Sequence, residues 1–184
     1  MSVPSSVPLL ERIQRLSRLM RRLILVGIVI DLGGVVALWA SDYMVRASLL
    51  PGLGLTPEQV TLTFDARLLG FVLSLPAAGI MLALLLESFR LFGDYADGRI
   101  FTPVAIGRLG RLARGILLLA ALQPPLHTLH VLVLTMHNPP GHRLLSLGVS
   151  SGELALAFVG GLLLAISWVM QEASRIATEN SEFV

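Results

Sequence analysis

The sequence contains no cysteine and no lysine, and each absence narrows what the chain can be. Without cysteine, disulfide bonds and thiolate metal sites are excluded. Without lysine, all 14 basic residues are arginine. Charged residues make up 14% of the chain, against about 25% in soluble proteins, whereas hydrophobic residues make up 54%. The composition therefore predicts a protein that is solvated by lipid.

The hydrophobic residues are concentrated in four blocks separated by polar segments. We expect membrane-spanning helices at about 23–40, 68–91, 115–136 and 154–170. At 1.5 Å per residue these lengths match a hydrocarbon core of roughly 30 Å. Pro76 lies inside the second block, where it is expected to kink the helix, and Pro124 and Pro125 are expected to interrupt the third. The predicted fold is all-α, a polytopic membrane protein forming one domain over residues 1–184.

The segments outside these blocks have helical patterns of their own. Residues 1–22 include an amphipathic stretch in which apolar residues at helical spacing lie opposite arginines, as in helices that lie on a membrane surface. Thr56 and Pro57 are typical of an N-cap and first residue, and predict a short helix in the connection 41–67. Thr102 and Pro103 predict an amphipathic interfacial helix that leads into the third crossing. Residues 171–184 form a polar tail.

The arginines are distributed unequally between the two sides that four crossings create. Eleven belong to the N-terminal segment, the central connection and the tail, and three to the other side: Arg46, Arg67 and Arg143. Because arginine-rich segments stay on the cytoplasmic side, both termini are expected in the cytoplasm. The predicted chain therefore makes multiple passes through the lipid bilayer.

Five polar residues are the candidates for an intramembrane site: Asp31, Gln123, His127, His130 and Glu153. Asp31 lies near the middle of the first block, where an ionised carboxylate costs several kcal/mol, so it should face other helices. Gln123, His127 and His130 share one face of the third helix. Gln123 or His127 should lie at a depth similar to that of Asp31, with His130 and Glu153 nearer the outer surface. A carboxylate and imidazoles could relay protons or hold a divalent metal. The alternative is a buried carboxyl and histidines that only hydrogen-bond neighbouring helices.

The remaining charged residues and the glycine pairs give less specific predictions. Glu87 and Arg90 could form an interfacial ion pair, and Arg108, Arg111 and Arg114 share one face that could contact lipid headgroups or a cytoplasmic partner. Glycine pairs in the helices would permit close packing, and therefore a homo-oligomer. No nucleotide-binding, nucleophile or zinc-protease motif is present. We therefore expect no catalytic residues, no cofactor and no direct contact with nucleic acid.

The stretch from Gly98 through Phe101 and Thr102 to Leu109, together with Glu179 and Asn180 near the end of the chain, resembles a bacterial membrane family, domain-of-unknown-function family 2975. The resemblance implies four membrane helices, with a Gly-x-x-Phe-Thr segment before the third and a Glu-Asn pair in the tail. It also implies a link to small helix-turn-helix regulators, and hence a cytoplasmic protein partner near Phe101, Thr102, Glu179 and Asn180.

Three functions are compatible with these patterns. The first, which we favour, is a non-enzymatic sensor or regulatory scaffold of the inner membrane that contacts a cytoplasmic regulatory protein. The second is an oligomeric channel or transporter component in which Asp31, His127 and His130 form a proton or cation path. The third is a membrane enzyme with a metal site of histidine and aspartate.

Overall fold

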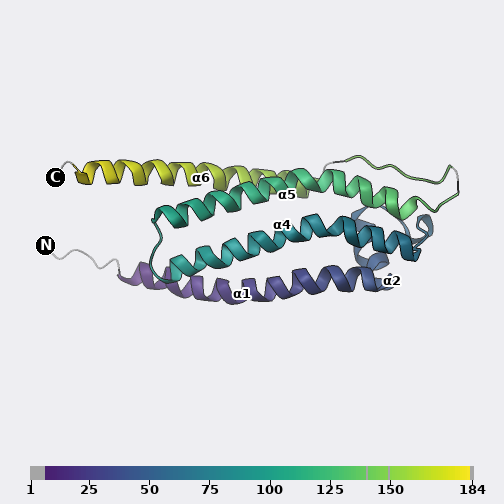
Figure 1. The fold of residues 1–184 in the computed structure, drawn as a ribbon, viewed down its shortest axis with the longest axis horizontal. Coiled ribbons are helices and arrows are strands. Elements are labelled where there is room, and N and C mark those ends of the chain that lie inside the picture. The colour runs from purple at the N-terminus through teal and green to yellow at the C-terminus, as the bar shows by residue number, and fades with distance from the viewer. Residues whose placement is uncertain (1–6, 140, 149, 183–184) are drawn as a thin grey trace. The chain divides into compact units, whose positions relative to one another are not determined.

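The computed structural model describes residues 7–139, 141–148 and 150–182, and its described part consists of helices and connections. Four helices of 32–34 residues dominate (Figure 1): α1 (Val7–Ala40), α4 (Phe64–Ala96), α5 (Pro103–Thr135) and α6 (Ser151–Glu182). All four are long and apolar enough to cross a membrane, which confirms the all-α prediction and the number of candidate spans. At about 50 Å, each is longer than a bilayer core is thick.

The helices are longer than the apolar blocks because the polar segments beside those blocks continue them. The amphipathic stretch before residue 23 belongs to α1, since its apolar positions keep their helical spacing and no proline or glycine ends it. The interfacial helix that Thr102 and Pro103 predict is the start of α5, which runs on into the third apolar block. Much of the predicted tail belongs to α6. The expected interfacial segments are therefore extensions of the spanning helices.

The proline pair does not interrupt the third helix, contrary to expectation. Pro124 and Pro125 lie inside α5, and Pro76 lies inside α4. Each proline removes one backbone donor, so the pair leaves the carbonyls of Ala120 and Ala121 without their usual partners. Helices in membranes tolerate such gaps where neighbouring helices cover them.

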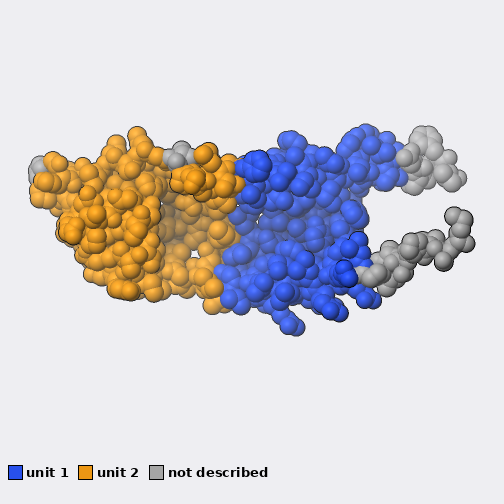
Figure 2. Space-filling view, turned by 180° about the vertical axis from the view of Figure 1, so that it is seen from behind, with its two compact units in different colours: residues 1–28, 83–117, 158–184 blue, residues 29–82, 118–157 orange. Residues whose placement is uncertain are grey.

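The chain divides into two compact units, coloured separately in Figure 2. Unit 1 comprises Met1–Ile28, Ala83–Leu117 and Phe158–Val184, and unit 2 comprises Val29–Leu82 and Leu118–Ala157. Each of the four long helices contributes a segment to both units, so neither unit is one continuous stretch of sequence. In unit 1, Leu91 packs with Ala105 and Leu112, which joins α4 to α5.

The core of unit 2 includes the connection between α1 and α4, which the sequence analysis treated as a polar link. This connection contains α2 (Asp42–Met44), the π-helical turn η1 (Val45–Leu49), α3 (Leu50–Gly52) and the 3₁₀ turn η2 (Pro57–Gln59). Val45 and Leu50 are fully buried and pack with Trp39 of α1 and with Val131 and Leu134 of α5. The connection is thus a folded part of the core. The expected N-cap is confirmed, because Thr56 and Gln59 form a reciprocal capping box.

Several glycines permit close contacts within each unit. In unit 1, a Cβ at Gly110 would lie 2.9 Å from Oγ of Ser167 on α6, and a Cβ at Gly160 would lie 2.9 Å from Leu117 on α5. Gly33, Gly34 and Gly161 have nothing within 4 Å of that position. The first group therefore serves packing within the chain, whereas the second leaves open surface.

Candidate functional site: a polar cavity in unit 2

A cavity of about 440 Å³ in unit 2 brings together all five polar residues proposed from the sequence. Asp31 comes from α1, Gln123, His127 and His130 come from α5, and Glu153 comes from the start of α6. Ser74 of α4 and Ser48 of η1 add two hydroxyl groups to the lining. The rest of the lining is mainly apolar and includes Leu49, Met81, Leu119 and Leu126. The cavity is therefore a polar chamber among helices that are otherwise apolar.

Asp31 and His127 are the cavity residues whose buried side-chain atoms have no hydrogen-bond partner among the described residues. These atoms are Oδ2 of Asp31 and Nδ1 of His127. Burying a polar atom without a partner costs about 1–3 kcal/mol. Proteins retain such atoms where another molecule completes their bonding. These two atoms are therefore the best candidates for contact with a ligand.

His130, in contrast, is held by the fold. Its Nδ1 lies 2.8 Å from the carbonyl oxygen of Leu126. Its Nε2 lies 3.1 Å from Oγ of Ser74 and 3.3 Å from the carbonyl oxygen of Gly70, and Oγ of Ser74 accepts a hydrogen bond of 3.0 Å from Nε1 of Trp39. The ring stacks on Trp39 with 5.9 Å between centroids. These contacts tie α1, α4 and α5 together, so His130 serves mainly to shape the cavity.

Glu153 has a local role as well as a place in the cavity. It is the third residue of α6, its carboxylate accepts from the backbone N–H of Ser150, and Oγ of Ser150 accepts in turn from the N–H of Glu153 at 3.4 Å. This reciprocal pair is a capping box, which satisfies donors at the start of the helix. One carboxylate of the cavity is thus partly used by the backbone.

Sequence reasoning missed Ser74 and Trp39 as parts of this site. Ser74 stands in an apolar block two positions before Pro76, and a polar side chain in such a block is a signal for the bundle interior. Trp39 stands near the end of the first apolar block, where an aromatic residue fits either an interfacial anchor or ordinary packing. It is 4% exposed and hydrogen-bonded, so it belongs to the core.

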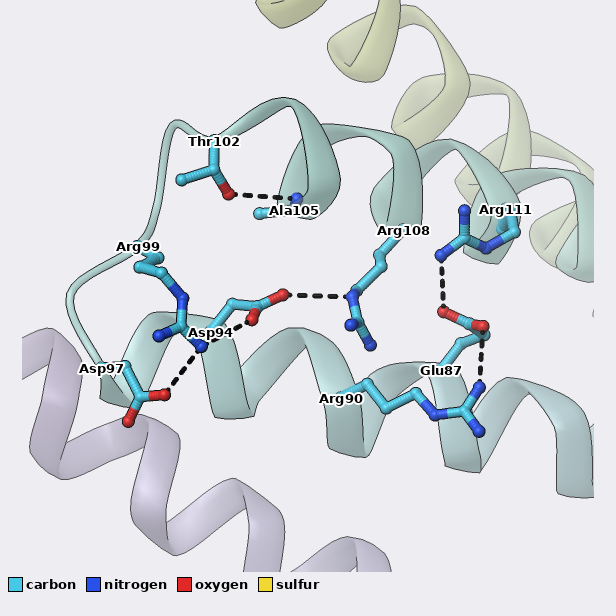
Figure 3. A network of polar contacts seen from close by, with 9 residues as sticks. All are labelled: Glu87, Arg90, Asp94, Asp97, Arg99, Thr102, Ala105, Arg108 and Arg111. Atoms are coloured by element: carbon cyan, nitrogen blue, oxygen red, sulfur yellow. Dashed lines mark hydrogen bonds and ion pairs between the residues drawn. The ribbon is translucent and has the colours of Figure 1, made fainter.

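The arginine face of α5 is largely neutralised by carboxylates of α4 in unit 1 (Figure 3). Arg108 forms an ion pair of 3.1 Å with Asp94, and Arg111 forms one of 3.2 Å with Glu87. The predicted pair of Glu87 with Arg90 is present at 3.2 Å. Arg114 donates to the carbonyl of Gly110 in its own helix. Arg108 and Arg111 thus hold α4 and α5 together, which reduces their availability to lipid headgroups or a partner.

The turn between α4 and α5 is fixed by Asp94 together with Asp97. Gly98 adopts a φ of 78°, a left-handed conformation that favours glycine, and so reverses the chain after α4. Arg99 donates to Asp94 at 3.1 Å and to Asp97 at 2.8 Å. The hydrogen bond to Asp94, with the charge of Asp97, raises the pKa of Arg99 above its ordinary value. Thr102 then caps α5, because its Oγ1 accepts from the N–H of Ala105, as predicted.

Unit 1 contains a hollow of its own, between the start of α5 and the end of α6. It has a volume of about 350 Å³ and is lined by Pro103 and Ile106 together with α6 residues that include Arg175 and Glu179. Phe101, just before α5, is 75% exposed. The proposed contact residues Phe101, Thr102 and Glu179 therefore belong to this same unit. The side chain of Asn180 lies outside the described residues.

Metal binding finds no support in the geometry. Among the residues that the structure describes, no group of three or more histidine, aspartate or glutamate side chains could hold a metal ion. Asp31 and His127 line one cavity but do not complete such a group.

The fold and the cavity define a multi-pass helical membrane protein with a polar chamber among its membrane segments. The chain belongs to the family described as "Protein of unknown function (DUF2975)", whose profile matches residues 53–184. The matched region contains the cavity residues of α4, α5 and α6, whereas Asp31 precedes it. Comparisons with curated proteins and with solved structures give no match.

Proposed function

We propose that this protein is a non-enzymatic sensor of the bacterial inner membrane, which binds a small molecule in the cavity of unit 2 and contacts a regulatory protein through unit 1. The cavity carries the proposal, because it gathers polar groups from α1, α4, α5 and α6, and two of their buried atoms have no partner among the described residues. A signal-receiving site and a partner-contacting surface then lie on the same continuous helices.

The arginine distribution supports an orientation with both termini in the cytoplasm. The positive-inside tendency assigns the eleven-arginine side to the cytoplasm. Unit 1 contains that side, including Arg12 and Arg15 of α1, and with them Phe101 and Glu179. The connection that contains Arg46 and Arg67 belongs to unit 2, and the same tendency assigns this connection to the outer side.

Binding is favoured over conduction because apolar segments adjoin the cavity on every long helix. In α1, residues 23–30 are all apolar, and in α5 residues 115–122 are likewise apolar. Eight helical residues span about 12 Å. Residues 75–86 of α4 and 154–166 of α6 are also without charge or polar side chains. A proton or cation path through one chain would have to cross this dry region, so a transport role would require a second copy to supply the polar route.

Photo-crosslinking from Phe101 tests the proposed cytoplasmic contact. With p-benzoylphenylalanine in place of Phe101, we expect capture of a soluble cytoplasmic protein in living cells, because this aromatic side chain is 75% exposed and stands two residues before Pro103, which lines the hollow of α5 and α6. Tyr43 is the matched control: it is aromatic, 78% exposed and part of the connection between α1 and α4, which the proposal places on the outer side. Capture of only lipid and copies of this chain from Phe101, or the same protein from both positions, would contradict the proposal.

A further inference from the structure

We infer that the ligand of the cavity is a lipophilic primary or secondary amine, bound as its ammonium ion to Asp31, with its apolar part directed towards the lipid. This inference rests on the proposed sensor function and names the chemical class that the sensor would recognise. Four observations carry it: the charge of the lining, the unpartnered acceptor atoms, the size of the cavity and an apolar hollow beside Asp31.

The charge of the lining favours a cation. The described lining residues include two carboxylates, Asp31 and Glu153, and no arginine. Their histidines are His127 and His130, and both ring nitrogens of His130 are occupied by contacts with Leu126, Ser74 and Gly70. A carboxylate without a counter-ion costs several kcal/mol within a membrane, and an ammonium ion removes that cost.

The unpartnered atoms favour a cation that donates hydrogen bonds. Oδ2 of Asp31 is an acceptor, and Nδ1 of His127 accepts when the ring hydrogen is on Nε2. A primary or secondary ammonium ion has two or three N–H donors, whereas a quaternary ammonium ion has none. Quaternary ions are instead recognised by aromatic rings, and the lining contains neither phenylalanine, tyrosine nor tryptophan among its described residues.

The size of the cavity favours an organic ion over a bare metal cation. At about 440 Å³ it lies in the range of small-molecule sites, and the described side chains form no group that could coordinate a metal. Apolar residues such as Leu49, Met81 and Leu119 would contact the carbon part of an amine.

Asp31 also borders a second hollow of unit 2, of about 250 Å³, whose other lining residues are all apolar. Among them are three large side chains of α1 and α4 that are more than two-fifths exposed: Leu32, Val36 and Leu75. Exposed apolar side chains of a membrane helix face acyl chains. The Asp31 carboxylate thus lies between a polar chamber and a lipid-facing crevice, which suits an amine with an apolar tail.

Calorimetric titration of the full chain in lipid nanodiscs, with empty nanodiscs subtracted, tests the inference. The probes are n-hexylamine, its neutral isostere hexan-1-ol, hexanoate and sodium chloride. We expect saturable binding of hexylamine alone. Asp31→Asn should weaken it about tenfold or more, because a charge-assisted hydrogen bond is lost. Asp65→Asn, the same change at an exposed position outside the cavity, should leave the affinity unchanged.

Each other outcome overturns the inference in a different way. Equal binding of hexan-1-ol shows an apolar site, binding of hexanoate shows an anion site, and heat from sodium chloride alone shows an inorganic cation site. If hexylamine binds equally well after Asp31→Asn, the Asp31 carboxylate does not hold the ammonium ion. If none of the four probes binds, the amine class is wrong, and crosslinking from Phe101 separately decides whether the sensor proposal fails with it.

Discussion

Gly70→Ala is expected to destabilise the protein by about 3 kcal/mol, a large effect for one methyl group. A Cβ at Gly70 of α4 would lie 2.0 Å from the ring of Trp39 on α1, so the ring would have to move. Trp39 cannot move freely, since it is buried, stacks on His130 and donates to Ser74. The same substitution should therefore disturb one wall of the cavity. Thermal unfolding in detergent measures the effect.

Gly79→Ala is the matched control on the same helix. Among the described residues, no atom outside the adjoining helix backbone lies within 4 Å of the Cβ position of Gly79, and alanine stabilises a helix interior by about 0.5–1 kcal/mol relative to glycine. We expect this variant to be as stable as the parent or slightly more stable. In the double variant with Trp39→Leu, Gly70→Ala should cost less than in the parent, because the smaller side chain removes the clash. Equal stabilities of the Gly70 and Gly79 variants would show that α1 and α4 do not approach each other closely at Trp39 and Gly70.

Asp94→Asn is the second substitution with a large expected effect, a loss of about 3 kcal/mol. The Asp94 side chain is 11% exposed and pairs with both Arg99 and Arg108, whose side chain is 20% exposed. Nε of Arg108 lies 3.1 Å from Oδ2 of Asp94 without the alignment of a hydrogen bond, so charge supplies the attraction. Asparagine keeps the shape but leaves Arg108 partly buried without a counter-ion. Chemical unfolding should report the loss.

Asp97→Asn separates this effect from a general change in charge. Asp97 lies three residues away, is 57% exposed and pairs with the same Arg99. Exposed ion pairs contribute little, so this variant should lose less than about 1 kcal/mol. In Asp94→Asn the turn at 97–102 should also become more sensitive to protease, because Arg99 loses one of its two partners. Similar losses of stability in both variants would argue against a buried network between α4 and α5.

The number and type of the long helices could be predicted from the sequence, whereas their ends could not. The apolar blocks are strong signals because a helix in lipid must satisfy its own backbone. The ends were misplaced because α1, α5 and α6 continue into arginine-rich or polar segments that keep helical spacing. The folded connection after Ala40 was missed, since burial of Val45 and Leu50 depends on contacts with α5 that no local pattern reveals.

The sequence could indicate which polar residues would line one cavity. Asp31 and the face of Gln123, His127 and His130 could be brought together because a charged group in lipid has to turn inward, and depth along two helices can be compared by counting residues. The distinction between His127 and His130 could not be predicted. It depends on Ser74, Trp39 and Leu126, which contact the ring of His130 and not that of His127.

Thiol labelling at Gln123 tests the polar cavity most directly, since the chain contains no cysteine of its own. Gln123→Cys would place a thiol in the cavity, and Leu118→Cys would place one at an exposed apolar position five residues earlier on α5. A thiol reacts as its thiolate, which needs water. In nanodiscs with a small charged methanethiosulfonate reagent, the account predicts that Gln123→Cys reacts about tenfold faster or more. Equal rates at the two positions would contradict a polar chamber among these helices.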